Sequence, residues 1–288
     1  MEEERETVDE TSRPRPDSRC TQRPGFYRNK ISVEISDIGR WTRQLRIQHG
    51  LTRPQAALRL HISEGTVKGI ENNQLEPSES ALASIVAGYN LDRAQERFTR
   101  ELAQAPVPLA PLAELRERAR APEWRARFAR LDRAGVACAF IDPLWNVIAA
   151  NMQFAASFPG VRDFEDNVAL WHFHPGVDDS PSEQTILFRD DESAYLVAAL
   201  RGALGRHRAE PRALELLRRL RADAAFSSRW IGTVAVAYGR GPDNPVHLLD
   251  RGTGVRYSLG IQLGKGMCGE SLQFCTALPS LYLGPVSA

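Results

Sequence analysis

The chain has 288 residues and a mass of 32.1 kDa, which is long enough for one large domain or two ordinary ones. Hydrophobic residues make up 42% and charged residues 25%, a globular composition that excludes a fibrous or wholly disordered chain. Lys and Arg number 37 against 36 Asp and Glu. The net charge of +1 therefore gives no electrostatic reason to expect the whole chain to bind nucleic acid.

The cysteines and the N-terminus indicate the reduced cytoplasm. The four cysteines, Cys20, Cys138, Cys268 and Cys275, form neither a disulfide framework nor a CxxC pair. Met1 is followed by acidic residues rather than by a secretory signal, and no apolar run approaches the length of a membrane span. We therefore expect a cytoplasmic protein that does not enter a membrane.

Composition divides the chain into four parts. Residues 1–30 are charged, contain several prolines and have almost no aliphatic side chains, so we expect a disordered arm. Residues 31–104 predict an all-α domain, and the prolines of residues 105–111 indicate a linker, because proline ends a helix. Residues 112–280 mix helical and alternating patterns, which predicts an α+β domain.

Five short helices are expected in the all-α part. Two capping boxes, Thr52 with Gln55 and Asp92 with Gln95, begin the second and the fifth helix. Ser63 is placed to cap a third helix after a tight turn. Two short helices joined by such a turn predict a helix-turn-helix.

Three runs in this part carry a more specific pattern. They are Arg43-Gln-Leu-Arg46-x-x-x-Gly50-Leu51-Thr52, Ile62-Ser63-x-x-Thr66-Val67-x-x-Ile70-Glu71 and Pro77-Ser78. Together they resemble the lambda-repressor-like, or XRE-type, DNA-binding domain. The resemblance implies a third helix in the major groove and a homodimer on double-stranded DNA. It places these residues at the DNA, with Arg53 and Lys68 as phosphate anchors: Arg43, Thr52, Arg53, Ser63, Glu64, Gly65, Thr66, Lys68 and Asn72.

Three positions depart from that family's pattern. Arg53 and His61 stand where the family usually has Gln and Gly, and Glu64 stands where it often has Arg. A carboxylate facing phosphates is unfavourable, although Glu can accept from cytosine in the major groove. Gly65 and Gly69 each cost about 1 kcal/mol in a helix relative to Ala. They indicate either a close approach to DNA or a module that no longer reads it.

The remaining chain predicts helices packed on an antiparallel sheet. Helical spacing covers residues 112–132, 192–207 and 211–226, and a short helix is expected at 151–158. Apolar runs predict strands at residues 135–142, 145–151, 245–250, 254–263 and 270–278. In the 211–226 helix we expect Leu214, Leu217 and Leu220 to face inward and Arg212 to face solvent.

Several segments from about residue 110 to 278 carry a second resemblance. They are Phe140-Ile-Asp142, Trp145-Asn-Val-Ile-Ala-Ala-Asn151, Asn167-Val-Ala-Leu-Trp171, Val197-Ala-Ala-Leu-Arg201 and Phe226-x-x-x-Trp230. As a set they are similar to the MmyB-like ligand-binding domain, which implies a PAS-like pocket for a fatty acyl or similar apolar small molecule. The aromatic residues expected to line it are Phe140, Trp145, Phe154, Phe158, Trp171, Tyr195, Trp230 and Tyr257. The same set could equally form a packed core.

These observations favour a DNA-binding transcription regulator tuned by a ligand, without a cofactor. We find no catalytic set and expect no enzyme. His172, His174 and His207 fit no standard metal site and are interpreted as structural. Residues 26–75 hold eight Lys and Arg against four Asp and Glu, a net charge of +4 (8 − 4), which is compatible with DNA binding. Three alternatives stay open: a protein-interaction scaffold, a C-terminal domain that only dimerises, and an enzyme.

Overall fold

The N-terminal module consists of five helices, as predicted. The computed structural model describes residues 32–174, 180–241, 243–264 and 271–285, so the predicted arm, Cys20 and Cys268 lie outside the described residues. The helices are α1 (Ile38–Gln48), α2 (Arg53–Leu60), α3 (Glu64–Glu71), α4 (Glu79–Gly88) and α5 (Arg93–Leu102).

Side-chain caps fix where these helices begin. Each cap accepts a hydrogen bond from a backbone N–H of the first turn; the caps are Asp37, Thr52, Ser63, Ser78 and Asp92. Both predicted capping boxes form, because Gln55 and Gln95 accept in return from the N–H groups of Thr52 and Asp92 at 2.8 and 3.1 Å. Local sequence alone therefore defines these helix starts.

Two aromatic side chains form the centre of this module's core. Trp41 and Phe98 are both fully buried and meet edge to face, with ring centroids 4.9 Å apart. The indole Nε1 of Trp41 donates to Thr99 Oγ1 at 2.8 Å. Gly39 allows α1 to approach α3, because a Cβ there would lie 2.6 Å from the carbonyl oxygen of Ile70. Helices α1, α3 and α5 thus share one core.

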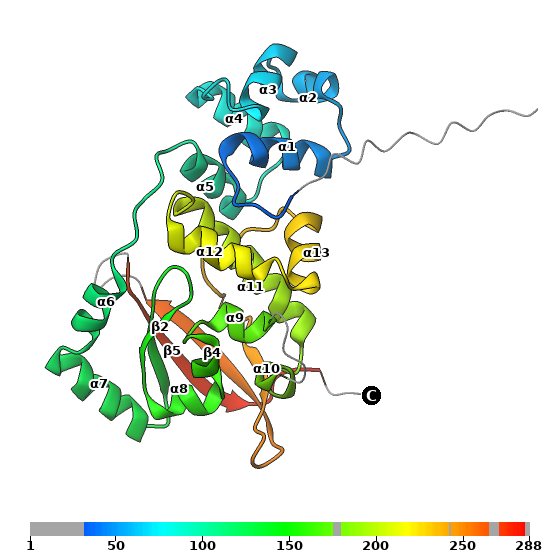
Figure 1. Cartoon of the computed structure of the whole chain (residues 1–288). Coiled ribbons are helices and arrows are strands. Elements are labelled where there is room, and N and C mark those ends of the chain that lie inside the picture. The colour runs from blue at the N-terminus through cyan, green and yellow to red at the C-terminus, as the bar shows by residue number, and fades with distance from the viewer. Residues whose placement is uncertain (1–31, 175–179, 242, 265–270, 286–288) are drawn as a thin grey trace, which may run out of the picture. The chain divides into compact units, whose positions relative to one another are not determined.

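The C-terminal module is built on a five-stranded antiparallel sheet in the order β2-β1-β5-β4-β3 (Figure 1). The strands are β1 (Ala137–Ile141), β2 (Val147–Ala150), β3 (Val246–Leu249), β4 (Arg256–Gly264) and β5 (Gln273–Leu281). All five were predicted, although β5 continues three residues past the expected end at 278. The chain as a whole is therefore α+β, as expected.

Helices cover both faces of this sheet. The helical elements of the module are α6 (Leu112–Ala119), α7 (Pro122–Arg133), α8 (Met152–Ser157), the 3-10 turn η1 (Val161–Phe164), α9 (Val168–Phe173), α10 (Pro181–Thr185), α11 (Arg189–Arg206), α12 (Pro211–Leu220) and α13 (Ala224–Gly232). Of these, α12 packs on α9 and α13 on α11. On one face, Trp124 of α7 packs edge to face on Phe140 of β1, with centroids 4.8 Å apart. On the other, Phe154 of α8 and Trp171 of α9 share a buried cluster with Leu259.

The single helix expected at residues 211–226 is wrong. Helix α12 ends at Leu220, and α13 begins after Asp223, whose carboxylate accepts from the N–H of Phe226 at 2.6 Å. The leucine spacing predicted one continuous helix, but Asp223 within it is the N-cap of a second helix. The cap therefore overrides the periodicity.

The expected orientation of two α12 side chains is also wrong. Leu214 is 51% exposed, because Leu216 rather than Leu214 belongs to the buried face together with Leu217 and Leu220. Arg212 does not extend into solvent. Its Nη1 lies 3.7 Å from the buried Asp142 Oδ2, and its Nη2 donates to the carbonyl of Ala110 at 2.6 Å.

Candidate DNA-binding surface and ligand cavity

The helix-turn-helix is formed by α2, a three-residue turn and α3. His61 ends α2 in the left-handed region, with φ 55° and ψ 38°. This conformation explains why glycine is usual at that position, because a Cβ is strained there. The turn nevertheless closes. Ser63 caps α3 by accepting from the N–H of Thr66 at 3.0 Å.

A buried ionic network fixes α3 against α1 and α2. Arg46 of α1 makes a bidentate contact with Glu71 of α3, at 2.5 Å from Nε and 3.1 Å from Nη2. Arg53 of α2 approaches the same carboxylate, with Nε 2.8 Å from Oε2. The side chain of Glu71 is fully buried, so loss of either arginine leaves its charge short of a partner. Arg46 and Glu71 stand in the sequence pattern quoted above, but the pattern did not reveal their pairing.

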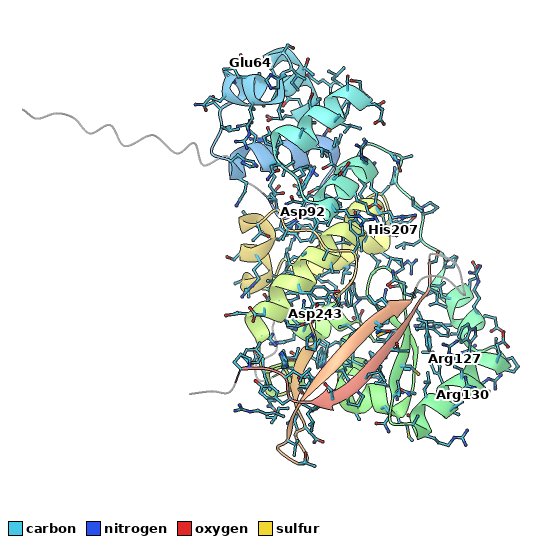
Figure 2. The ribbon with its side chains drawn as sticks, turned by 180° about the vertical axis from the view of Figure 1, so that it is seen from behind. Glu64, Asp92, Arg127, Arg130, His207 and Asp243 are labelled. Atoms are coloured by element: carbon cyan, nitrogen blue, oxygen red, sulfur yellow. The ribbon has the colours of Figure 1, made fainter. Side chains whose placement is uncertain are left out.

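The outward side of α3 is open to solvent. Glu64, Gly65, Lys68 and Asn72 are exposed and Thr66 is half-buried, while Val67 and Ile70 are fully buried beneath them. Figure 2 places Glu64 at the outer surface of the helical module. The structure therefore brings together five of the nine residues predicted to contact DNA, four of them on α3 and Asn72 at its C-cap.

The other four predicted DNA contacts have different placements. Thr52 and Ser63 are the N-caps of α2 and α3 and lie beside those helix N-termini. Arg43 is half-buried on α1. Arg53, predicted as a phosphate anchor, commits its Nε to Glu71 and keeps 31% of its side chain exposed. Whether these residues contact DNA stays a prediction.

A cavity of about 210 Å³ lies where α5, the linker, α11 and the sheet meet. Its walls combine apolar and polar side chains, the usual composition of a small-molecule site. The residues that line it are Arg97, Val107, Pro108, Ile141, Asp142, Pro143, Trp145, Tyr195, Ala199, Gly202, Ala203, Arg206, His207, Ala237, Tyr238, Gly239, Leu263, Ser271 and Gln273.

The polar groups of this cavity are held by neighbouring side chains and backbone. Burial raises the pKa of Asp142, whose carboxylate accepts from the N–H groups of Leu144 and Asn146, both at 2.9 Å. His207, labelled in Figure 2, has its Nδ1 2.7 Å from the carbonyl oxygen of Val107, and burial lowers its pKa. Neutral His207 therefore donates from Nδ1, which leaves Nε2 as an acceptor.

Only two of the eight aromatic residues predicted to contact ligand border this cavity. They are Trp145 and Tyr195, which meet edge to face with centroids 6.4 Å apart. The other six belong to core clusters. Phe140 packs beside Trp124, and Trp230 stacks on Phe226. A third cluster contains Phe154, Phe158 and Trp171, and half-buried Tyr257 of β4 packs against it. Sequence reasoning missed Arg97, Arg206 and Tyr238, because only the fold brings these distant residues to one cavity.

Protein-family models match both modules. A helix-turn-helix domain matches residues 37–98, and an MmyB-like transcription regulator ligand-binding domain matches residues 122–247. The chain combines these two domains. The second match ends within β3, so it covers less of the chain than the resemblance expected to residue 278.

The regulator therefore joins a DNA-binding domain to a ligand-binding domain. Both matched families are transcription-regulator domains, and neither is an enzyme family. No curated protein matches the regulator. Across its described residues, no helix is long and apolar enough to span a bilayer.

Proposed function

We propose that the regulator is a cytoplasmic homodimer that reads a specific operator and whose DNA affinity changes when an apolar small molecule, such as a fatty acyl compound, fills the cavity. The exposed side of α3, fixed by the buried Arg46–Glu71 pair, carries the DNA-binding part of this proposal. A recognition helix must hold its orientation to read base edges, and a desolvated bidentate pair supplies that rigidity.

The cavity supports the ligand-binding part of the proposal. Ile141, Trp145 and Leu263 contribute apolar surface, while Asp142 and His207 contribute a few oriented polar groups. The order of elements also fits a PAS-like sensor. Strands β1 and β2 are joined by a turn, helices follow them, and β3, β4 and β5 complete the sheet. Ligand binding and DNA binding are then linked thermodynamically, and each changes the affinity for the other by the same factor.

Fluorescence anisotropy tests the proposal directly. The purified full-length protein is titrated onto duplexes that tile the DNA around its own gene, at about 50 and about 200 mM salt, with and without sodium laurate. We expect tight binding to one tile that weakens about 10³-fold or more with salt, since phosphate contacts release counterions. We also expect laurate to change that affinity about fivefold or more.

Two other outcomes would favour the alternatives. Weak binding to every tile, with no salt dependence, would make the helix-turn-helix a protein-docking module. Tight, salt-sensitive binding to one tile, with no thermal shift in laurate and no co-purified small molecule in native mass spectra, would leave the C-terminal domain a dimerisation module only.

A further inference from the structure

The segment between α13 and β3 contacts both modules. We call residues 233–239, Thr-Val-Ala-Val-Ala-Tyr-Gly, the connecting strap. It forms no helix or strand, so its backbone groups must find partners elsewhere. The partners of Thr233 and Val234 come from the helical module, and those of Ala235 and Ala237 come from the C-terminal module.

Two glutamines of the helical module hold the start of the strap. Gln44 Nε2 of α1 donates to the carbonyl of Thr233 at 3.0 Å, and Gln95 Nε2 of α5 donates to the carbonyl of Val234 at 2.9 Å. The next alternate side chain, Val236, is 8% exposed and belongs to the core cluster of Trp41. The strap therefore completes the core of the DNA-binding domain.

The C-terminal module holds the same strap through α11. The buried Arg201 donates through Nη1 to the carbonyl of Ala235, and through Nη2 to the carbonyl of Trp230 at 2.7 Å. The N–H of Ala237 donates to the carbonyl of Ala198 at 3.0 Å. Gly202 makes this close approach possible, because a Cβ there would lie 2.9 Å from the carbonyl oxygen of Ala237.

The end of the strap forms a wall of the cavity. Ala237, Tyr238 and Gly239 all line it. The hydroxyl of Tyr238 donates to Glu101 Oε2 of α5 at 2.5 Å, and the guanidinium of Arg97 lies 3.7 Å from the centre of the Tyr238 ring. One short segment thus has its end in the cavity and its middle in the core of the DNA-binding domain.

We propose that the connecting strap is the element through which cavity occupancy reaches the DNA-binding helices, and that Gln95 is a positioning residue that couples it to α5. The ligand in this scheme rests on the function proposed above, whereas the mechanical coupling depends only on this chain. An occupant that displaces Tyr238 moves the backbone at 237–239. Gln95 and Val236 then pass that displacement to α5 and to the core shared with α1, and α1 packs directly against α3.

A substitution that fills the cavity tests the coupling without any ligand. Ala203 lines the cavity, so Ala203→Leu places extra apolar volume there in the full-length protein. We expect Ala203→Leu to change hydrogen exchange of α5 amides about fivefold or more. In the double variant Ala203→Leu/Gln95→Glu that change should fall to about onefold. Glutamate keeps the capping box with Asp92 but cannot donate to Val234.

A matched control uses the other capping box. Gln55→Glu makes the same chemical change at the start of α2, where the side chain of Gln55, among the residues that the structure describes, bonds only to its own cap, Thr52. The effect of Ala203→Leu on α5 should persist in that background. Tyr238→Phe, which removes the hydroxyl that bonds Glu101 and keeps the ring, should also weaken the transmitted change.

The results separate the strap from the ligand. If the change at α5 survives both Gln95→Glu and Tyr238→Phe, it travels by the direct packing of α11 on α5, and the proposal is overturned. An absence of change at α5 in Ala203→Leu alone overturns it as well. With laurate as the probe, Gln95→Glu should bring the laurate-induced change in DNA affinity to about onefold while laurate still quenches tryptophan fluorescence. Failure of the unsubstituted protein to bind DNA or laurate would reject the proposed function, and the exchange experiment would still decide the role of the strap.

Discussion

At the scale of single residues, His61 carries backbone strain that a glycine would relieve. Its φ of 55° is in the left-handed region, which costs a residue with a Cβ about 1 kcal/mol or more. We expect His61→Gly to raise the free energy of unfolding by about 1 kcal/mol, offset in part by the greater chain entropy of glycine. Urea denaturation measures this as a higher midpoint at constant slope. His61→Ala keeps the Cβ and should give no such gain.

Gly65 and Gly69 have different roles in the structure. A Cβ at Gly69 would lie 3.1 Å from Leu75 Cβ, so packing within the protein explains that glycine. At Gly65 the nearest such atom, Ser63 Oγ, is 3.6 Å away, so the protein itself has room for a side chain. Under the proposed function, close approach of DNA to the first turn of α3 would account for Gly65.

The substitution Gly65→Ala distinguishes these roles. It should stabilise the protein by about 0.5–1 kcal/mol because alanine is the better helix former, yet weaken operator binding because its methyl group faces the DNA. Gly69→Ala is the comparison variant and should gain less stability than Gly65→Ala, because its Cβ would lie 3.1 Å from Leu75 Cβ. Urea denaturation and anisotropy on the operator measure the two effects. Unchanged operator affinity in Gly65→Ala would remove this helix end from the DNA contact.

Glu64 places a carboxylate on the predicted DNA-facing side of α3. Glu64→Arg should strengthen non-specific binding, change the sequence preference and add about one to the salt slope, since one more phosphate contact forms. Anisotropy at several salt concentrations measures all three. Glu117→Arg makes the same charge change on α6 of the C-terminal module and should leave them unaltered. Equal behaviour of the two variants would contradict the placement of α3 against DNA.

At the scale of elements, α11 approaches α5 through a glycine. A Cβ at Gly205 would lie 2.2 Å from Phe98 Cε2 and 2.7 Å from Phe98 Cζ, within the core of the DNA-binding domain. Gly205→Ala should therefore destabilise the protein by about 1–3 kcal/mol through overpacking. Gly232→Ala is the matched control, because its Cβ on α13 would meet nothing within 4 Å. Thermal and urea unfolding of both variants provide the measurement. Equal free energies of unfolding for Gly205→Ala and Gly232→Ala would show that α11 can move away from α5 without loss of stability.

Helix α9 contains a buried histidine that makes stability depend on pH. His172 is fully buried, and burial, followed by the charges of Arg189, His174 and Arg229, holds its pKa well below the usual value near 6.5. Below about pH 6.5 the unfolded chain binds a proton that the folded chain does not, so stability falls as pH falls.

The expected loss approaches about 1.4 kcal/mol per pH unit for this one group. Urea midpoints between about pH 7.5 and 5.5 measure it. His172→Gln retains a polar partner for Ser193, whose Oγ lies 2.8 Å from His172 Nε2. In this variant the urea midpoint should fall less steeply as the pH is lowered. An equally steep fall in that variant would assign the effect to His207 and His247, whose pKa values burial also lowers.

Elements defined by local chemistry were predictable from the sequence. Thr52, Ser63 and Asp92 cap helices because their side chains bond to backbone only two or three residues away. The break at Asp223 is equally local, but the leucine periodicity around it concealed the cap. The connecting strap gave no signal, because it has no periodicity and its partners lie far away in the sequence.

The cavity was the least predictable part. Phe140, Trp171 and Trp230 share aromatic chemistry with Trp145 and Tyr195, and sequence cannot separate side chains that pack together from side chains that border a void. That difference depends on the registers of β1 and β5 and on the packing of α11. Non-local geometry of this kind leaves no pattern in the chain.

At the scale of the whole molecule, the described residues from Ser32 to Pro285 group as a single unit by their contacts, and the predicted linker at 105–111 lies inside this unit. Trp230 Nε1 donates to the carbonyl of Glu34 at 3.1 Å, and Arg208 Nη2 donates to the carbonyl of Leu102 at 3.2 Å. Both bonds cross the expected boundary, from donors in the C-terminal module to carbonyls of the helical module. The two modules should therefore unfold in one transition rather than two.

The position of Val236 has a consequence for building hybrid regulators. A designer who joins this helix-turn-helix to a foreign sensor would naturally cut at the proline-rich stretch 105–111. That cut removes Val236 from the core of the DNA-binding domain. It also removes the backbone carbonyls that accept hydrogen bonds from Gln44 and Gln95. The transferable unit is instead discontinuous: the first hundred or so residues plus a heptapeptide encoded some 130 codons downstream. Recombination that respects only the linear order of the gene would separate two pieces of one folded object.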